Sequence, residues 1–288
     1  MGIFCLMLLV VLYGSVLYTR DNSNVQRMFR WTLLASIATV CSDILWGFTY
    51  DGSYGASASW AVNIIYTVSE SMTYLLWAMH YRASHADFPK GRMLVPWVLP
   101  AILAIAMCIT SMGTGAYISI DSSGVYTRGP LHGLYTLIVS LPVIVVTLES
   151  MWRMARSHRR SEIMREATLA GFILPLVGCA VVQILWYDLP ALAIGLTLSL
   201  LVVYINTQNM KITEDPITGL SNRFRMGVYL ESRFDECRNW GGILHLAVMD
   251  LDHFTAIVAA NPPPAPATGR SPWSPASSRT PARGGGAS

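Results

Sequence analysis

Residues 93–112 read MLVPWVLPAILAIAMCITSM, a stretch without a single charged side chain. An α-helix needs about 20 predominantly apolar residues to cross a bilayer, so this stretch predicts a transmembrane helix. Six further runs of similar character lie near residues 2–19, 30–50, 59–81, 131–152, 167–187 and 190–208. The pattern predicts an all-α membrane bundle of about seven transmembrane helices over residues 1–210. Six helices are the alternative, because the first run is short and the gap between the last two is tight.

The composition points to the same class of protein. Of the 288 residues, 53% are hydrophobic and 13% are charged, and the mean hydropathy is +0.43, whereas soluble domains carry roughly 25% charged residues. The net charge of +3 is too small to predict a nucleic-acid partner. The five cysteines follow no disulfide or metal-ligand spacing. Membrane lipid is therefore the first partner that the sequence predicts.

Basic residues alternate between the connections of the predicted helices. The connections after the first, third and fifth runs carry most of them: Arg20, Arg27, Arg30, Arg82, Lys90, Arg92, Arg153, Arg156, Arg159, Arg160 and Arg165. The intervening connections carry only Arg128. Short cytoplasmic loops are enriched in Lys and Arg, so we expect the N-terminus outside and the chain after residue 210 in the cytoplasm. The expected location is the inner membrane of a bacterial cell.

Two acidic residues lie inside predicted helices, Asp43 in the second and Glu70 in the third. Ionisable groups are costly within a bilayer and often functional. Glu70 shares a helical stripe with polar and aromatic residues: Asn63, Tyr66, Thr67, Thr73, Tyr74 and Trp77. One hypothesis is a pocket between helices that senses a ligand or protons. The simpler hypothesis is hydrogen bonding between helices that holds the bundle together.

Segments at the ends of the predicted helices give two smaller expectations. Residues 113–129 form the longest external connection, and their isoleucines and tyrosines predict a small hairpin or a segment at the membrane interface. His80, His85 and His158 lie near predicted cytoplasmic ends and are expected to be solvated.

Two motifs follow the last apolar run. Residues 215–223 read DPITGLSNR, and residues 246–254 read LAVMDLDHF. Between them, Ser221 is a good N-cap for a helix over about 222–238, with Met226, Leu230 and Phe234 as its buried stripe. Residues 243–249 are almost wholly apolar and predict a central strand that is buried on both faces.

In this order the two motifs resemble the opening of a GGDEF domain, the output module of diguanylate cyclases. The family pattern D-x-L-T-G-L-x-N-R is matched by Asp215, Thr218, Gly219, Leu220, Asn222 and Arg223, with Ile217 in place of Leu. The family pattern D-x-D-x-F is matched by Asp250, Asp252 and Phe254. The resemblance implies the start of an α/β, nucleotide-cyclase-like domain over residues 211–257.

The resemblance also implies a metal site and a substrate. Asp250 would be the metal-binding carboxylate, Leu251 would offer its backbone carbonyl, and Asp252 belongs to the same motif. The implied cofactor is Mg²⁺, which carboxylates hold together with substrate phosphates. The implied reaction joins two GTP molecules into cyclic di-GMP. Because the family brings two GTP-loaded domains face to face, a homodimer is implied as well.

The chain departs from the family at positions that decide activity. The family's Lys and Asn after D-x-D-x-F are replaced by Thr255 and Val258, and the loop Gly-Gly-(Asp/Glu)-Glu-Phe is absent from the printed residues. Gly241 and Gly242 precede the metal strand, so they are not this loop. No catalytic residue is assigned, and we expect no cyclase activity. Residues 258–288 are rich in Pro, Ala, Ser and Gly, which predicts a disordered tail or the product of a frameshift that truncates the domain.

These observations leave two function classes. The first is a multi-pass membrane sensor coupled to a diguanylate cyclase output that is truncated and inactive here. The alternative is a non-enzymatic membrane receptor or interaction protein that keeps a vestige of the GGDEF domain. A transporter is disfavoured, because no repeat relates the two halves of the membrane region.

Overall fold

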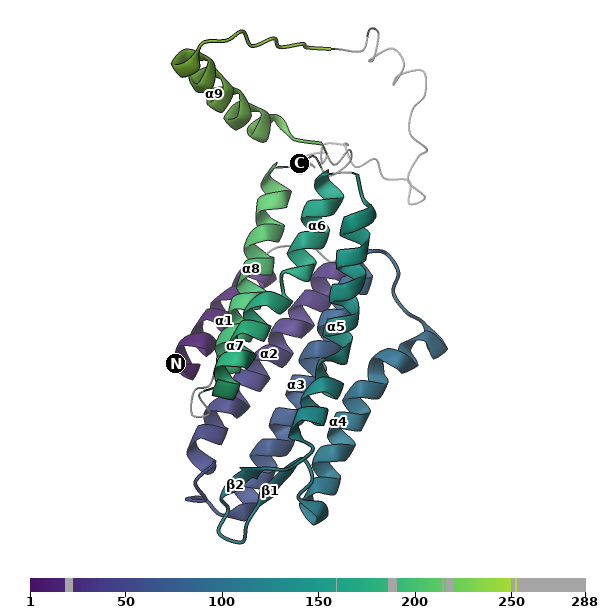
Figure 1. The fold of residues 1–288 in the computed structure, drawn as a ribbon, viewed down its shortest axis with the longest axis vertical. Coiled ribbons are helices and arrows are strands. Elements are labelled where there is room, and N and C mark those ends of the chain that lie inside the picture. The colour runs from purple at the N-terminus through teal and green to yellow at the C-terminus, as the bar shows by residue number, and fades with distance from the viewer. Residues whose placement is uncertain are drawn as a thin grey trace, which may run out of the picture. The chain divides into compact units, whose positions relative to one another are not determined.

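A computed structural model describes residues 1–18, 23–158, 160–185, 191–213, 215, 220–249 and 252. In chain order it contains α1 (Gly2–Tyr18), α2 (Asn24–Thr49), α3 (Ala56–Ser84), a 3-10 turn (Gly91–Leu94), α4 (Val95–Thr114), β1 (Ile118–Ile120), β2 (Tyr126–Arg128), α5 (His132–Arg156), α6 (Arg160–Ala170), α7 (Ile173–Leu185), α8 (Ala191–Thr213) and α9 (Arg223–Trp240). Figure 1 shows α1 to α8 as a helical bundle with the β1–β2 hairpin at one end. The chain divides into two units, Met1–Tyr229 and Leu230–Ser288, and each is described by itself.

Helices lie at every apolar run that the sequence predicts. Among the described residues, five are long and apolar enough to cross a membrane: Asn24–Thr49, Gly91–Thr114, His132–Arg156, Glu162–Val182 and Ala191–Met210. A mostly helical fold with several helices that could span a membrane is therefore confirmed. α1 is apolar but has only 17 residues, and α3 is long but rich in polar side chains. The count of seven spans stays a prediction.

The sixth apolar run is interrupted, whereas the sequence predicted one continuous helix. α6 ends at Ala170 and α7 begins at Ile173. Pro175 follows the break, and a proline removes a backbone donor and clashes with the carbonyl four residues earlier, here that of Gly171. At the break, Phe172 is fully buried and its ring stacks on Trp77 of α3 at 3.9 Å between centroids.

The packing of α2 against α3 joins two rows of small hydroxyl residues. Thr39 and Thr73 lie 3.2 Å apart between their Oγ1 atoms, and the Oγ atoms of Ser42 and Ser69 lie 3.5 Å apart. The Ser36 hydroxyl donates to the carbonyl of Thr32 within its own helix. Small residues let helix backbones approach closely in a membrane, and hydroxyls add hydrogen bonds between helices.

The connection 113–129 forms a hairpin, which is one of its two predicted forms. β1 and β2 pair antiparallel, with Ser119 opposite Thr127. The turn is closed by Asp121, whose carboxylate accepts hydrogen bonds from Ser123 Oγ and from the N–H of Val125. The bond from Ser123, followed by that from Val125, lowers the pKa of Asp121. The stabilisation that these bonds give is therefore present above about pH 4 and is lost as the pH falls through the lowered pKa of Asp121.

The hairpin turn packs on the connection between α2 and α3. The N–H of Tyr126 donates to the carbonyl of Tyr50, and the Ser59 hydroxyl reaches the carbonyl of Gly124 at 2.9 Å. Gly124 has a φ of +94°, and a Cβ there would lie 2.8 Å from the carbonyl carbon of Gly55. Only glycine fits this conformation and this close approach.

Three predictions about residues 220–249 are wrong. The N-cap of α9 is Asn222, whose Oδ1 accepts from the N–H of Arg225, and not Ser221. The predicted apolar stripe is not buried, since Met226 is 49% and Phe234 58% exposed. Residues 243–249 form no strand, and Val248 is 86% exposed. An apolar strand is stable only with partner strands on its edges, and the described residues supply none to this segment. The whole of the predicted tail, residues 258–288, lies outside the described residues.

Replacing Gly124 by alanine should weaken the bundle through this turn. We expect Gly124→Ala to lower the free energy of unfolding by about 1–3 kcal/mol, because the residue has a left-handed backbone and meets backbone atoms. Thermal unfolding of the protein in detergent measures the loss. The matched control is Gly113→Ala in α4, where a Cβ meets nothing within 4 Å. Equal stability of the two variants would contradict the role of the turn.

Candidate functional site

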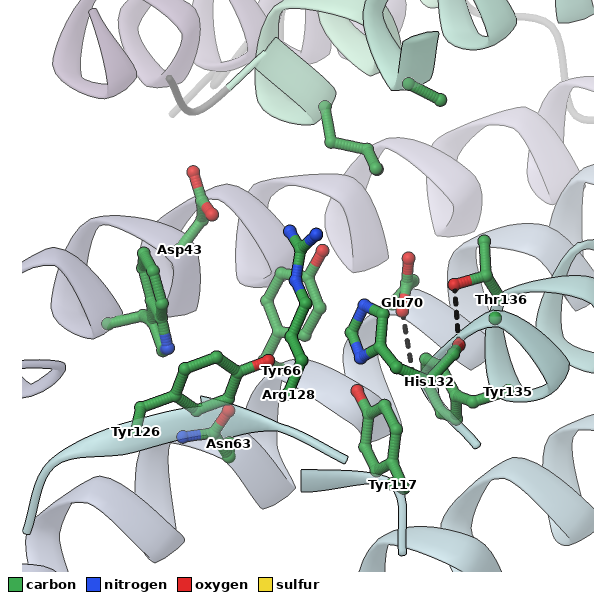
Figure 2. Close-up of a pocket in the computed structure, with 14 residues that line it drawn as sticks. Asp43, Asn63, Tyr66, Glu70, Tyr117, Tyr126, Arg128, His132, Tyr135 and Thr136 are labelled. Atoms are coloured by element: carbon green, nitrogen blue, oxygen red, sulfur yellow. Dashed lines mark hydrogen bonds between the residues drawn. The ribbon is translucent and has the colours of Figure 1, made fainter. Parts of the chain in front are cut away.

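The bundle contains a partly open cavity of about 360 Å³ at the hairpin end. Its walls come from α2, α3, the hairpin, α5, α7 and α8: Asp43, Trp46, Asn63, Tyr66, Glu70, Tyr117, Tyr126, Arg128, His132, Gly133, Tyr135, Thr136, Ala180 and Leu192. Figure 2 shows how the labelled side chains surround this space. The two acids that the sequence singles out therefore line one cavity, although they lie on different helices.

Glu70 is held at the wall by tyrosines. Its Oε2 accepts a hydrogen bond from the Tyr135 hydroxyl of α5 at 2.8 Å, and its Oε1 accepts a longer one, 3.5 Å, from Tyr74 of α3. Glu70 is 6% exposed, and the Tyr135 ring stacks on Tyr117 at 3.8 Å between centroids. Glu70 thus links α3 to α5 as the simpler hypothesis expects, and it also faces the cavity.

Asp43 differs from Glu70 in having no such support. Its Oδ2 is buried and has no hydrogen-bond partner among the described residues. Trp46, one turn further along α2, lines the same cavity, and its ring and that of Tyr126 form a T-shaped pair with 5.3 Å between centroids. A buried polar group without a partner is costly. A donor group of a bound ligand could therefore supply the hydrogen bond that Asp43 lacks.

The hairpin closes the outer part of the cavity. Tyr126 and Arg128 of β2 line it, and in Figure 2 the Arg128 guanidinium points toward the space between Asp43 and Glu70. His132, at the start of α5, stacks on Tyr117. Burial, and then the negative charge of Glu70, raise the pKa of Tyr117 well above its usual value, so its phenol stays protonated. The hairpin thus contributes aromatic and cationic groups to a site whose acids come from the helices.

The sequence did not reveal the contributions of the hairpin and of α5. Glu70 and Tyr135 are separated by 65 positions, and no spacing rule joins residues that far apart. The tyrosines of residues 113–129 were the available signal, since several aromatic side chains in one short external connection seldom all face solvent. Of the predicted stripe, Asn63, Tyr66 and Glu70 line the cavity, whereas Trp77 packs on Phe172 away from it.

Two helices connect the cavity to the second half of the membrane region. Ala180 of α7 and Leu192 of α8 form part of the wall. α8 continues without interruption from Ala191 to Thr213, which at 1.5 Å per residue carries the chain roughly 30 Å from Leu192. Asp215, the first residue of the GGDEF-like motif, follows two positions later.

The GGDEF-like motifs are only partly described. Asp215 donates its N–H to the carbonyl of Leu220, Asn222 caps α9, and Arg223 is the first residue of that helix. Asp252 is an exposed turn residue. Thr218, Gly219, Asp250 and Leu251 lie outside the described residues. Within the described part of the chain, no three His, Cys, Asp or Glu side chains gather to hold a metal ion. These residues alone do not assemble the implied Mg²⁺ site.

A second polar cluster lies among the helix ends away from the hairpin. His85 Nε2 lies 2.6 Å from Glu166 Oε1, and both side chains are almost fully buried. The Ser150 hydroxyl of α5 also donates to Glu166. His80 is buried as well, with its Nδ1 3.1 Å from the carbonyl of Val25. The prediction that His80 and His85 are solvated is therefore wrong, because neighbouring helices cover this end of α3.

Comparison of the chain with models of protein families, with curated proteins and with solved structures gave no match. The resemblance of residues 215–257 to a GGDEF domain therefore stays a prediction from the sequence.

The bond between Tyr135 and Glu70 should stabilise the bundle. We expect Tyr135→Phe to lower the free energy of unfolding by about 1 kcal/mol, because it removes a short hydrogen bond to a buried carboxyl group. Unfolding of the protein by SDS in bicelles measures this loss. The matched control is Tyr74→Phe, which removes the 3.5 Å bond to the same residue. A loss in Tyr74→Phe as large as in Tyr135→Phe would show that the shorter bond has no special role.

Proposed function

We propose that this protein is a membrane-embedded sensor whose output module belongs to the diguanylate cyclase family. The cavity lined by Asp43 and Glu70 is the sensory site. The observation that carries the proposal is the path of α8. This one helix forms part of the cavity wall at Leu192 and ends at Thr213, next to the motif that begins with Asp215.

The arrangement suits a signal that crosses the membrane. The distribution of Lys and Arg predicts that the hairpin lies outside and residue 213 inside. The cavity, which the hairpin partly covers, is then reached from outside, and GTP would meet the output on the cytoplasmic side. A ligand that binds one arrangement of the cavity more tightly shifts the protein toward that arrangement. Because a helix is stiff, a displacement at Leu192 reaches Thr213.

The output half of the proposal rests on the sequence motifs. When bound, Mg²⁺ would neutralise the phosphates of GTP and activate a hydroxyl. Since the described residues do not assemble its site, no reaction step is assigned to them. The exposed apolar residues of 243–249 favour the alternative function, a non-enzymatic membrane receptor. An apolar segment that no described residue covers is what a non-enzymatic receptor with a vestigial GGDEF segment would carry.

A fusion of residues 1–213 to an intact GGDEF domain tests the sensory half of the proposal. We expect Leu192→Trp in this fusion to change cyclic di-GMP production on the order of fivefold or more, because the larger ring enters the cavity from α8. The matched control is Leu198→Trp, which makes the same change at an exposed position of the same helix. The measurement is cyclic di-GMP formed per fusion molecule in membranes. Identical cyclic di-GMP production by both variants would favour the alternative, a non-enzymatic receptor whose cavity is not coupled to an output domain.

Purified protein of the 288 printed residues should not convert GTP. The printed sequence lacks the signature loop that would cradle the phosphates. Incubation with GTP and Mg²⁺, followed by chromatography of the nucleotides, should show no cyclic di-GMP, while the fusion serves as the positive control. Metal-dependent formation of cyclic di-GMP by the printed chain would show that this expectation is wrong.

A further inference from the structure

We propose that the cavity binds a small organic monocation of the amine class, with its N–H groups on Asp43 and its apolar body against the aromatic wall. The inference deepens the proposed function and rests on it for the role of this cavity as the sensory site. The binding itself follows from four features of the wall: an unpartnered acceptor, an imbalance of charge, aromatic faces and a limited volume.

The unpartnered acceptor is Asp43. Glu70 receives two phenolic hydrogen bonds, whereas the buried Oδ2 of Asp43 receives none from the described residues. An ionised carboxylate only accepts hydrogen bonds, so the missing partner is a donor. An ammonium group supplies N–H donors and a positive charge together, and charge-assisted bonds of this kind are the stronger ones.

The charges of the lining residues favour a cation. Two acids, Asp43 and Glu70, face one arginine, Arg128. Arg128 already has an interaction of its own. His132 adds no charge in the form that fits its surroundings, because its buried Nδ1 has no partner among the described residues and an imidazolium needs an acceptor at both nitrogens. Among the described lining residues the acids therefore outnumber the cationic groups by one, and a monocation suits this wall better than an anion.

Aromatic rings supply the rest of the surface. Trp46 lies on the same helix as Asp43, one turn away, and Tyr66 and Tyr126 complete this side of the cavity. The face of an aromatic ring attracts a cation, most strongly in tryptophan. The same rings pack well against an apolar ligand body. An inorganic cation would leave this surface unused, so the wall fits an organic amine better.

The volume limits the size of the ligand. A cavity of about 360 Å³ is near the lower end of the range for small-molecule sites, roughly 300–1,000 Å³. A single-ring arylalkylamine is of suitable size. The wall also predicts a preference within the class, because a quaternary ammonium has no N–H to give to Asp43. A primary amine should bind more tightly than its trimethylated form.

The first test measures binding of four probes to the full chain in lipid nanodiscs by titration calorimetry. The probes are 2-phenylethylamine, its N-trimethylated analogue, 3-phenylpropionate and phenylalanine. They share one ring and differ in charge and in N–H donors. We expect 2-phenylethylamine to bind most tightly, about tenfold or more tighter than each of the others. Tighter binding of the carboxylate or of the zwitterion would overturn the inference, and so would the absence of binding by the amine at 10 mM.

The second test assigns the binding to Asp43. Asp43→Asn removes the charge and keeps the shape, and we expect it to weaken the binding of 2-phenylethylamine about tenfold or more. The matched control is Asp51→Asn, which changes an acid just beyond the same helix whose carboxylate binds the N–H of Ser53 instead. Equal affinity of the Asp43→Asn variant and the original chain, with both folded by circular dichroism, would overturn the assignment.

The same probes separate this inference from the proposed function. If 2-phenylethylamine binds but leaves the output of the fusion unchanged, the ligand class stands and the sensory role fails. If Leu192→Trp changes the output but the amine does not bind, the sensory role stands and the ligand class fails.

Discussion

The structure depends on one constraint, which is that hydrocarbon offers no partners to polar groups. Side-chain hydroxyls between α2 and α3 must therefore bond to protein atoms. Thr32, Ser36 and Thr39 each donate to a carbonyl one turn earlier in α2, and Thr73 does the same in α3. Their small size then allows the two helices to approach until Thr39 meets Thr73. The remaining helices pack around this pair.

The cavity begins where this close packing ends. Toward the hairpin, α3 also carries the larger polar residues Glu70, Tyr66 and Asn63, which need partners or space. One partner comes from α5 through Tyr135, and the hairpin supplies further groups. The position of the hairpin depends in turn on Gly124, where a side chain would not fit. The need for glycine at position 124 thus affects the cavity, because the hairpin that this turn positions carries the lining residues Tyr126 and Arg128.

Local sequence patterns predicted the helices, but they could not predict contacts between segments that are distant in the sequence. Apolar runs located α1 to α8, because each residue that faces lipid must itself be apolar, so the sequence shows the pattern directly. The break before Pro175 was missed, since prolines also lie inside α4 and α5 without ending them. Asp43 and Glu70 were identified as unusual within apolar runs. Their cavity was not, because its other walls come from segments that approach only in the folded bundle. The strand at 243–249 was predicted from apolarity alone, which gives no information about whether partner strands exist.

The polarity of α3 has a structural meaning that a hydropathy scale misses. A helix that faces lipid needs apolar side chains, but a helix surrounded by other helices does not. α3 packs against α2, α4 and α5, and Figure 1 shows it between them. Its buried residues include Ser69, Glu70 and Ser71 in succession, so protein covers more than one of its faces. The polar residues of α3 are therefore what a helix surrounded by other helices is expected to have, and they allow α3 to be counted as a sixth span beside the five that are long and apolar enough. α3, which is not among the five helices that are long and apolar enough to cross a membrane, thus takes part both in the close packing with α2 and in the wall of the cavity.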